Sequence, residues 1–97
     1  MPPAVYLPEA RDDIDEAFTQ YQARLLGLGD RFLAALARSV SLIETNPLLF
    51  GEVAPGIRAA PLRKFPHLVY YREDPNQVLV IAVRHGRDDP AVWQVRA

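Results

Sequence analysis

Two apolar runs separated by a short polar turn constrain what this chain can fold into. Residues 67–73 are rich in β-branched and aromatic side chains, and residues 77–85 form a second apolar run. The intervening Asp74-Pro75-Asn76 is typical of a turn, so the pattern predicts a β-hairpin. Apolar side chains occupy both faces of the second strand, with Val78, Val80 and Ala82 on one and Leu79, Ile81 and Val83 on the other. We therefore expect this strand in the centre of a sheet that is covered on both sides.

The first half of the chain predicts a helical hairpin that supplies this cover. Pro8 and Glu9 suit the first turn of a helix, which Gly27 and Gly29 end. A second helix is expected from about Asp30 to Asn46-Pro47, because proline disfavours helix at the residue before it. The residues with helical spacing are Ala10, Ile14, Ala17, Phe18, Tyr21, Leu25 and Leu28 in the first helix, and Phe32, Leu33, Leu36, Val40 and Ile43 in the second. Two helices with so short a connection run antiparallel.

The remaining segments complete a single small domain over residues 1–97. We expect a short strand at Val5-Tyr6-Leu7 and another over residues 57–63, where Pro61 marks an edge or bulge position. Residues 48–56 are expected to form a loop whose apolar start, Leu48-Leu49-Phe50, fills the gap between helices and sheet. A turn at residues 86–90 then precedes a short final element. The predicted fold class is α+β, in the order β-α-α-β-β-β, with the helical hairpin packed on a small, mainly antiparallel sheet.

Composition excludes several classes of function. The chain has no cysteine, and therefore no disulfide, no thiolate nucleophile and no cysteine-based zinc site. It has no glycine-rich phosphate loop and no serine at a strained elbow, so we expect no cofactor and no serine hydrolase. Its start lacks the basic and apolar stretches of a signal peptide, and no apolar run approaches the roughly 20 residues that span a bilayer. We expect a cytoplasmic protein without a membrane partner.

Charge is distributed unequally along the chain. Residues 1–48 carry four arginines against seven acidic residues, a net −3, whereas residues 49–97 carry seven basic against five acidic residues, a net +2. The two halves are expected to present opposite faces to partners. The basic excess is too small for a domain that binds duplex DNA through phosphate neutralisation alone.

Short fragments in a particular order resemble a known family, the ParE/RelE superfamily of small toxins from bacterial type II toxin–antitoxin systems. The resemblance covers nearly the whole chain. It rests on Glu9-Ala10, Asp13-Ile14, Asn46-Pro47, Gly56-Ile57-Arg58, Leu62, Phe65-Pro66, Val69-Tyr70-Tyr71-Arg72, His85, Arg87-Asp88, Pro90 and Trp93. Each fragment alone is weakly specific, and their order and spacing carry the comparison.

The resemblance implies one of two activities. RelE-like members cleave mRNA on the ribosome and commonly use a tyrosine near the C-terminus, whereas the ParE-like members that have been studied poison DNA gyrase. Here Trp93 is the last aromatic residue and no tyrosine follows Tyr71. An indole cannot exchange a proton near neutral pH as a general acid or base must. The hypothesis is therefore a ParE-like inhibitor of DNA gyrase and replication, without a cofactor or catalysis of its own. The alternatives are a ribosome-dependent mRNA endonuclease and a regulatory module that has lost toxicity.

The resemblance also implies partners and sites. The first partner is a cognate antitoxin, expected to be of the ribbon-helix-helix type, which would form a hetero-oligomer with the toxin and connect it to DNA only indirectly. The residues expected to bind the target are Arg58, Arg63, Arg72, Arg84, His85, Arg87 and Trp93. Those expected to bind the antitoxin are Leu25, Leu28, Phe32, Leu33, Arg72 and Arg84. In the endonuclease alternative the positioning and charge-stabilising set is Arg58, Arg63, Lys64, Arg84 and His85.

Each of these assignments has a simpler structural interpretation. The basic residues are also compatible with solvated strand ends that form weak local salt bridges. Arg84 has the strongest functional claim, because it is predicted to share a face with Val78, Val80 and Ala82, where an unpaired charge is costly. His67 and His85 titrate near neutral pH and suit acid–base chemistry, but they also suit packing at the sheet edge. A metal site that combines them with Asp88 or Asp89 is less favoured, because nothing in the sequence has ligand spacing.

Overall fold

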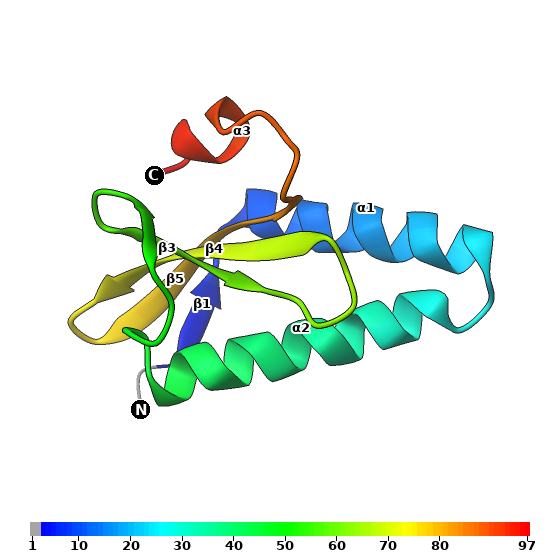
Figure 1. Cartoon of the computed structure of the whole chain (residues 1–97), viewed down its shortest axis with the longest axis horizontal. Helices are drawn as coiled ribbons and strands as arrows, with labels where there is room; N and C mark the ends of the chain where they lie inside the picture. The colour runs from blue at the N-terminus through cyan, green and yellow to red at the C-terminus, as the bar shows by residue number, and fades with distance from the viewer. Residues whose placement is uncertain (1–2) are drawn as a thin grey trace.

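The computed structural model describes residues 3–97; Met1 and Pro2, the start of the predicted domain, lie outside the described residues. The chain forms a helical hairpin, a five-stranded mixed sheet and a short C-terminal helix (Figure 1). The elements are β1 (Ala4–Tyr6), α1 (Pro8–Arg24), α2 (Leu28–Thr45), β2 (Glu52–Ala54), β3 (Ile57–Pro61), β4 (His67–Asp74), β5 (Gln77–His85) and α3 (Ala91–Gln94). The predicted α+β class and hairpin are confirmed, and the structure adds β2 and α3.

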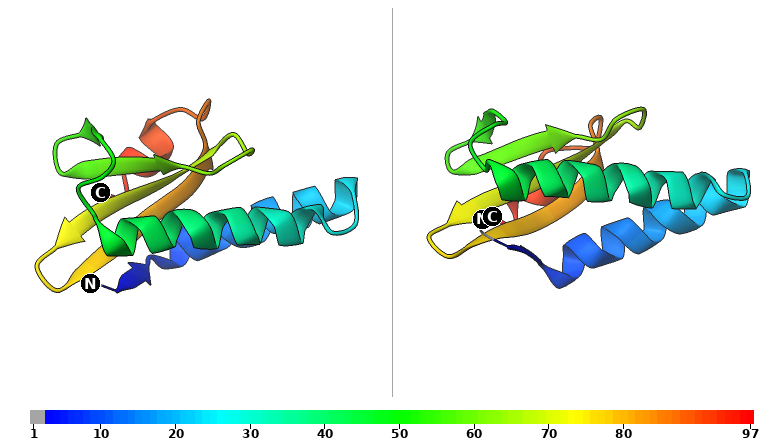
Figure 2. Two further views of the ribbon diagram at one scale, coloured as in Figure 1. Left: turned by 60° about the horizontal axis from the view of Figure 1, so that its bottom comes forward. Right: turned by 90° about the horizontal axis from the view of Figure 1, so that it is seen from below.

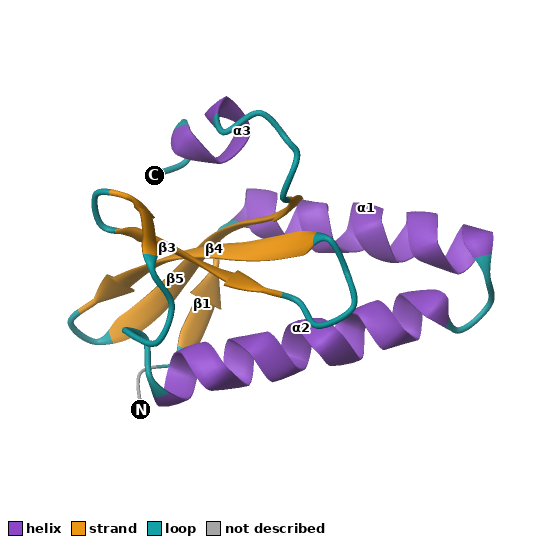
Figure 3. Ribbon diagram, in the orientation of Figure 1, coloured by secondary structure: helices purple, strands orange, loops and turns teal. Residues whose placement is uncertain are grey.

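The sheet has the strand order β1-β5-β4-β3-β2, so β5 lies inside it as predicted (Figure 3). Strands β4 and β5 pair antiparallel from Asp74↔Gln77 at the turn to His67↔His85 at the open end. The N-terminal β1 instead runs parallel to β5, with Ala4 opposite Val78. The short β1 therefore covers only the first part of β5, which leaves the rest of that edge to other groups.

The helical hairpin packs on one face of the sheet (Figure 2). Gly27, at φ 90°, occupies the left-handed conformation between the helices, where glycine is favoured. At Gly29 an added Cβ would lie 2.8 Å from the Phe18 ring, so the two helices approach closely there. Helix α1 ends at Arg24, four residues earlier than Leu28, which the predicted apolar stripe included. Phe32 and Ile43 of α2 are fully buried and centre this first core.

A β-bulge divides the apolar faces of β5 differently from the simple alternation in the sequence. Tyr70 lies opposite Ala82 and Tyr71 opposite Val80, so Ile81 is an extra residue in β5. Val78 and Val80 face the helices, whereas Ala82 belongs to the second core. The prediction that Arg84 shares a face with both valines and Ala82 is therefore wrong, because the bulge shifts the period between them.

The second core lies on the face of the sheet away from the helical hairpin. Trp93 of α3 stacks on Tyr70 with ring centroids 4.7 Å apart and an interplanar angle of 16°. Ile81 and Ala82 complete the buried centre of this cluster. The final element that the sequence left untyped is thus a short helix that covers the second face of the central strands.

The segment after α2 differs in part from its prediction. Leu48 and Leu49 are 59% and 54% exposed and do not fill the gap between helices and sheet, whereas Phe50 is half-buried and packs against the first core as expected. Pro47 is buried instead, and its carbonyl accepts a hydrogen bond from the Tyr71 hydroxyl. The following residues, predicted as loop, include β2, a three-residue strand at the sheet edge. A strand this short carries too little periodicity to be recognised from sequence.

Candidate functional site

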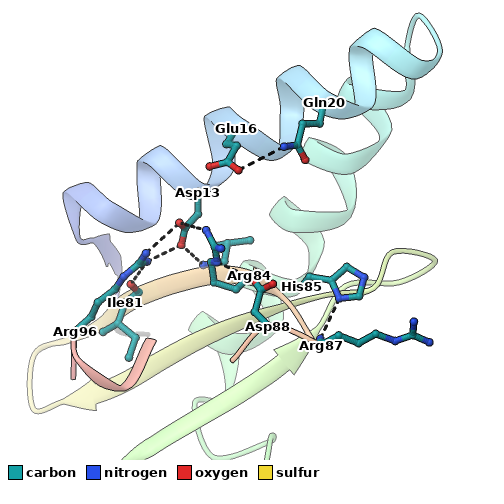
Figure 4. A network of polar contacts seen from close by, with 10 residues as sticks. Asp13, Glu16, Gln20, Ile81, Arg84, His85, Arg87, Asp88 and Arg96 are labelled. Atoms are coloured by element: carbon teal, nitrogen blue, oxygen red, sulfur yellow. Dashed lines mark hydrogen bonds and ion pairs between the residues drawn. The ribbon is translucent and has the colours of Figure 1, made fainter. Parts of the chain in front are cut away.

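A buried carboxylate on α1 organises the polar side of the molecule. Asp13 is 4% exposed at its side chain and lies between Arg84 of β5 and Arg96 after α3 (Figure 4). Arg96 binds it through both terminal nitrogens, with Nη1···Oδ2 at 2.6 Å and Nη2···Oδ1 at 3.2 Å. Arg84 Nη1 donates to Oδ1 at 3.1 Å, and Arg84 Nε donates to Asp88 Oδ2 at 2.8 Å. We refer to Asp13, Arg84, Asp88 and Arg96 as the Asp13 network.

The Asp13 network completes the edge of β5 that β1 does not reach. The Leu7 N–H donates to the Val80 carbonyl, and there the backbone pairing with the N-terminal segment ends. Arg96 Nη1 then donates to the Ile81 carbonyl at 3.2 Å, and Asp13 Oδ2 accepts the Val83 N–H at 3.0 Å. Side chains thus satisfy backbone groups that a longer β1 would otherwise pair.

The same contacts fix the charge of Arg84. Burial alone lowers the pKa of this guanidinium, but its hydrogen bonds and charge interactions with Asp13 and Asp88 outweigh that effect, and the net shift is upward. Arg84 therefore stays protonated, and two carboxylates neutralise it internally. A ligand that binds Arg84 would have to compete with both of them.

Beside this network lies a polar cleft of about 230 Å³ between α1 and the open end of the β4–β5 hairpin. His67 and His85 meet in it with ring centroids 5.8 Å apart. His67 Nδ1 is 3.4 Å from the Tyr21 hydroxyl, and His85 Nδ1 accepts the Arg87 N–H at 3.0 Å. Burial is the main cause that lowers the pKa of His67, and the neighbouring His85 lowers it further, so His67 is neutral at pH 7. Both rings are thus held through Nδ1.

A second, larger concavity lies between α2 and the β3–β4 loop. It is an open groove of about 740 Å³, which we call the basic groove; its lining residues are Leu28, Arg31, Ala34, Ala35, Arg38, Arg63, Lys64 and Phe65. Four of these residues are cationic and none is acidic. The remaining four are apolar and provide its floor. The basic groove shares no residue with the polar cleft.

The residues predicted to bind the target are spread over several places. Arg63 lines the basic groove, while Arg84 and His85 line the polar cleft. Arg58 donates to the Phe50 carbonyl at 2.6 Å near the opposite end of β3. Arg72 pairs with Asp74, Arg87 is exposed, and Trp93 of α3 is only 5% exposed.

The residues predicted to bind the antitoxin also separate. Leu25 and Leu33 are 57% and 37% exposed near the tip of the helical hairpin, which extends past the sheet in Figure 1. Leu28 is half-buried and lines the basic groove. Phe32 is fully buried between the helices and the sheet, so its ring contacts no partner in this conformation.

Sequence reasoning did not identify Asp13, Arg96, Arg31 or Arg38 as site residues. A signal for Asp13 was present, because it lies three residues after Ala10 and four before Ala17, on the buried face of α1. A carboxylate at such a position needs a buried partner. Nothing in the sequence near Arg96 indicates its contact with Asp13, and nothing near Arg31 or Arg38 indicates the groove that they line.

Two kinds of site are absent from the part of the chain that the structure describes. Across residues 3–97, no three side chains of the metal-ligating types come together as a metal site. Within the same range, no helix has the length and apolar character needed to cross a bilayer.

Comparison with known proteins now decides the family. The family model described as "ParE toxin of type II toxin-antitoxin system, parDE" matches residues 4–90, nearly the whole chain. The chain belongs to the ParE toxin family. No curated protein sequence matches it.

A solved structure supports the same fold for this ParE toxin. The chain is similar to one titled "Chromosomal ParDE TA system from P. aeruginosa", with a TM-score of 0.77 and 13% sequence identity. The match covers 88% of this chain and 96% of that one. At such low identity the likeness concerns the fold alone. As a ParE toxin of a type II system, the protein has an antitoxin as its partner.

Proposed function

We propose that this ParE toxin inhibits DNA gyrase and thereby blocks replication, and that a cognate antitoxin of the ribbon-helix-helix type neutralises it. Toxin and antitoxin form a hetero-oligomer in this proposal, and the toxin meets operator DNA only through the antitoxin. It needs no cofactor, because it acts by contact with the enzyme that it inhibits.

One observation carries the choice of target, and it concerns the C-terminal aromatic residue. RelE-like nucleases commonly place a tyrosine there, whereas this chain has Trp93, stacked on Tyr70 in the second core. An indole cannot act as a general acid or base, and this one is 5% exposed. Trp93 therefore supports the target surface through packing.

The endonuclease alternative would require its assigned residues to converge on one phosphodiester. Arg63 and Lys64 lie in the basic groove, and Arg84 and His85 lie in the polar cleft. Arg58 is tied to the Phe50 carbonyl near the other end of β3. This dispersal supports the gyrase proposal over the nuclease. The polar cleft, with its two imidazoles, is the feature that favours the alternative.

The decisive experiment compares the two targets with the same purified toxin. Supercoiling by DNA gyrase should be inhibited in proportion to toxin concentration, while mRNA on translating ribosomes stays intact. In cells that express the toxin alone, incorporation of labelled thymidine should stop before incorporation of labelled amino acids. Cleavage of mRNA at codon boundaries, with gyrase unaffected, would reject the proposal in favour of the nuclease. No effect in either assay would indicate a regulatory module.

Among the residues proposed to contact gyrase, the exposed cations Arg63 and Arg87 are the most accessible. Arg87→Ala should weaken gyrase inhibition more than Arg11→Ala does. Arg11 is an exposed cation on α1 and lies outside the proposed surface. Both substitutions should leave the unfolding free energy nearly unchanged, because they remove exposed side chains. Equal loss of inhibition in the two variants would remove Arg87 from the target surface.

A further inference from the structure

The turn that follows β5 holds one of its N–H groups with a side chain that can change its charge. The Gly86 N–H donates to the Pro66 carbonyl at 2.8 Å, and the Asp88 N–H donates to the His85 carbonyl at 3.0 Å. Between them, the Arg87 N–H donates to His85 Nδ1 at 3.0 Å. Of these three acceptors, only the imidazole can take up a proton between about pH 5 and pH 8.

The same local geometry occurs after α2 with an acceptor that does not titrate. There the Leu48 N–H donates to Asn46 Oδ1 at 3.2 Å. In both turns a side chain accepts the N–H of the residue two positions later, a role that asparagine and aspartate commonly have in turns. Because an amide oxygen accepts at every pH, the turn at Asn46 is a natural reference for the turn at His85.

Protonation changes the imidazole from an acceptor to a donor at the atom that closes the turn. A neutral histidine has one N–H and one accepting nitrogen, whereas both nitrogens of a protonated histidine carry hydrogen. Because His85 Nδ1 accepts the Arg87 N–H, the neutral ring carries its hydrogen on Nε2. A further proton on Nδ1 would point at the hydrogen of the Arg87 N–H. The hydrogen bond would then be lost, and the two donors would repel each other.

The cross-strand neighbour of His85 does not take up this proton in its place. His67 lies opposite His85, and a backbone hydrogen bond joins the next pair, Pro66 and Gly86. Hydrogen-bonded and non-hydrogen-bonded pairs alternate in antiparallel strands, so the histidines form a non-hydrogen-bonded pair, whose side chains lie close together. Their ring centroids are 5.8 Å apart, so a proton on one ring disfavours a proton on the other. Burial lowers the pKa of His67, which leaves His85 as the ring that can be charged.

Other titratable and charged groups face His85 across the polar cleft and from its own strand and turn. They are Asp13, Glu16, Tyr21 and Arg24 of α1, His67 of β4, and Arg84 and Asp88 of β5 and the turn. Arg84 already binds Asp13 and Asp88. Within residues 3–97 no carboxylate forms an ion pair with His85. The bond to the Arg87 N–H is therefore the contact that a proton on His85 would change most.

We propose that the turn at residues 86–88 is an acid-sensitive switch, which His85 keeps closed while its ring is neutral and releases when its ring is protonated. The turn carries the exposed cation Arg87, and it carries Asp88, which binds Arg84 of the Asp13 network (Figure 4). Release would free the backbone that positions the Arg87 side chain. Only an effect on gyrase rests on the proposed function, because the change in the turn is a property of the toxin alone.

The test measures exchange of the Arg87 amide hydrogen with water, by NMR on the full-length toxin. After correction for the intrinsic pH dependence of exchange, the Arg87 amide should exchange at least about fivefold faster at about pH 5.5 than at about pH 7.5. The Leu48 amide is the internal reference, and its corrected rate should change by less than about twofold over the same range, because Asn46 does not titrate. A corrected rate at Arg87 that does not change with pH while the His85 ring signals titrate would overturn the proposal.

Substitutions at the two histidines assign the effect to one ring. His85→Asn is the matched variant, because the amide oxygen can accept the Arg87 N–H at every pH, and its Arg87 amide should stay protected throughout. His85→Phe has no acceptor and should show fast exchange at Arg87 at every pH. His67→Phe retains His85 and should retain the pH dependence. Circular dichroism checks that each variant is folded. The same pH dependence at Arg87 in His85→Asn as in the parent would overturn the proposal.

The effect on gyrase is measured separately. The ratio of inhibition by His85→Asn to inhibition by the parent should rise at least about twofold between about pH 8 and about pH 6, since only the parent turn is released. Use of the ratio removes the pH dependence of gyrase itself. A constant ratio would reject control of the target surface by the turn. A toxin that inhibits gyrase at no pH would reject the proposed target, but the exchange measurement on the free toxin would still decide whether the switch exists.

Discussion

The Asp13 network and the basic groove both contain arginines, but the arginines are paired in the network and unpaired in the groove. In the network, Arg84 and Arg96 share Asp13, and Arg84 also binds Asp88, so each cation is satisfied within the protein. In the groove, four cations face solvent, and no acidic residue lines the site. Charge on this toxin is therefore divided between cations that are paired within the fold and cations that remain exposed and unpaired in the groove.

The difference shows that the sequence alone does not reveal which basic residues are paired within the fold. Arg84 had the strongest claim in the sequence because an arginine among apolar residues should be expensive to bury unpaired. In the structure, Asp13 and Asp88 accept hydrogen bonds from Arg84, and these ion pairs offset the cost of burying its charge. Arg31 and Arg38 of α2, which no sequence motif distinguished, are among the cations that form no ion pair within residues 3–97. Accessible charge follows from which carboxylates are nearby, and this depends on the whole fold.

The largest expected effect comes from removing the centre of the Asp13 network. Asp13→Ala leaves two guanidinium groups and the Val83 N–H without their partner. The free energy of unfolding should fall by about 3 kcal/mol, the low end for a buried ion pair, because Arg84 keeps Asp88 and 25% of its side-chain exposure. Urea denaturation measures the change.

The matched control for that substitution is Asp12→Ala, which removes an exposed carboxylate one residue earlier on α1. Its unfolding free energy should stay within about 0.5 kcal/mol of the parent. Similar destabilisation by both variants would mean that the network contributes no more than a surface charge.

A smaller loss of stability is expected on acidification. It should arise from His67 in the polar cleft, beside the Asp13 network, and not from the basic groove. The pKa of His67 is lowered in the folded state by burial and by His85, so the unfolded chain binds the proton more readily. Stability is therefore complete above the unfolded value of about 6.5 and declines as the pH falls from there towards the folded pKa. Urea midpoints between pH 8 and pH 5 follow this decline.

His67→Phe should flatten this part of the pH profile, because phenylalanine keeps the ring contacts with Tyr21 and Phe32 and cannot titrate. An unchanged pH profile in His67→Phe would assign the dependence to another group.

The next effect has the opposite sign. Lys64→Gly should raise the unfolding free energy by up to about 1 kcal/mol, since glycine adopts φ 68° without strain but also gains more freedom in the unfolded chain. Urea denaturation measures this change, and a loss of stability would show that glycine relieves no strain at Lys64.

The control for Lys64→Gly is the same substitution at the preceding groove cation, Arg63. The backbone of Arg63 lies outside the left-handed region, so glycine relieves no strain there. Arg63→Gly should therefore lower the unfolding free energy or leave it unchanged, as measured by urea denaturation. Equal stabilisation by both substitutions would mean that the gain does not come from the left-handed backbone of Lys64.

The smallest expected effect is the one that completes the comparison. Arg38→Gln removes an exposed charge from the groove, and thermal or urea unfolding should change by less than about 0.5 kcal/mol. Arg96→Gln, which removes a charge from the Asp13 network, should destabilise clearly more because its side chain is 14% exposed and paired. Equal effects would remove the distinction between structural and available cations.

Local patterns in the sequence were enough for most of the fold. The β4–β5 hairpin and the helical hairpin were predicted because their turns are short and their apolar periods are continuous. Pro61 was also placed correctly, on a part of β3 that β2 does not cover. Its carbonyl accepts the Ser39 hydroxyl at 2.9 Å, so a helix replaces the missing neighbouring strand.

The features that escaped prediction depend on contacts between distant segments. The bulge at Ile81 cannot be recognised from the sequence, because both faces of this strand are apolar. An extra apolar residue there leaves the hydrophobic pattern unchanged. The partner of Asp13 at Arg96 lies 83 residues away. The basic groove joins α2 to the loop before β4, and no spacing within either segment reveals that they meet.

The pairing of β1 with β5 has a consequence for how the toxin comes into being. Residue 4 cannot find residue 78 until most of the chain has been made, and Asp13 must wait for Arg96. At about 5–20 residues per second on the ribosome, the 83 residues between them take about 4–17 s to synthesise. Throughout that interval the helical hairpin exists without a finished sheet. The apolar face of the hairpin, with Phe32 and Ile43 at its centre, therefore stays uncovered for seconds in each new molecule.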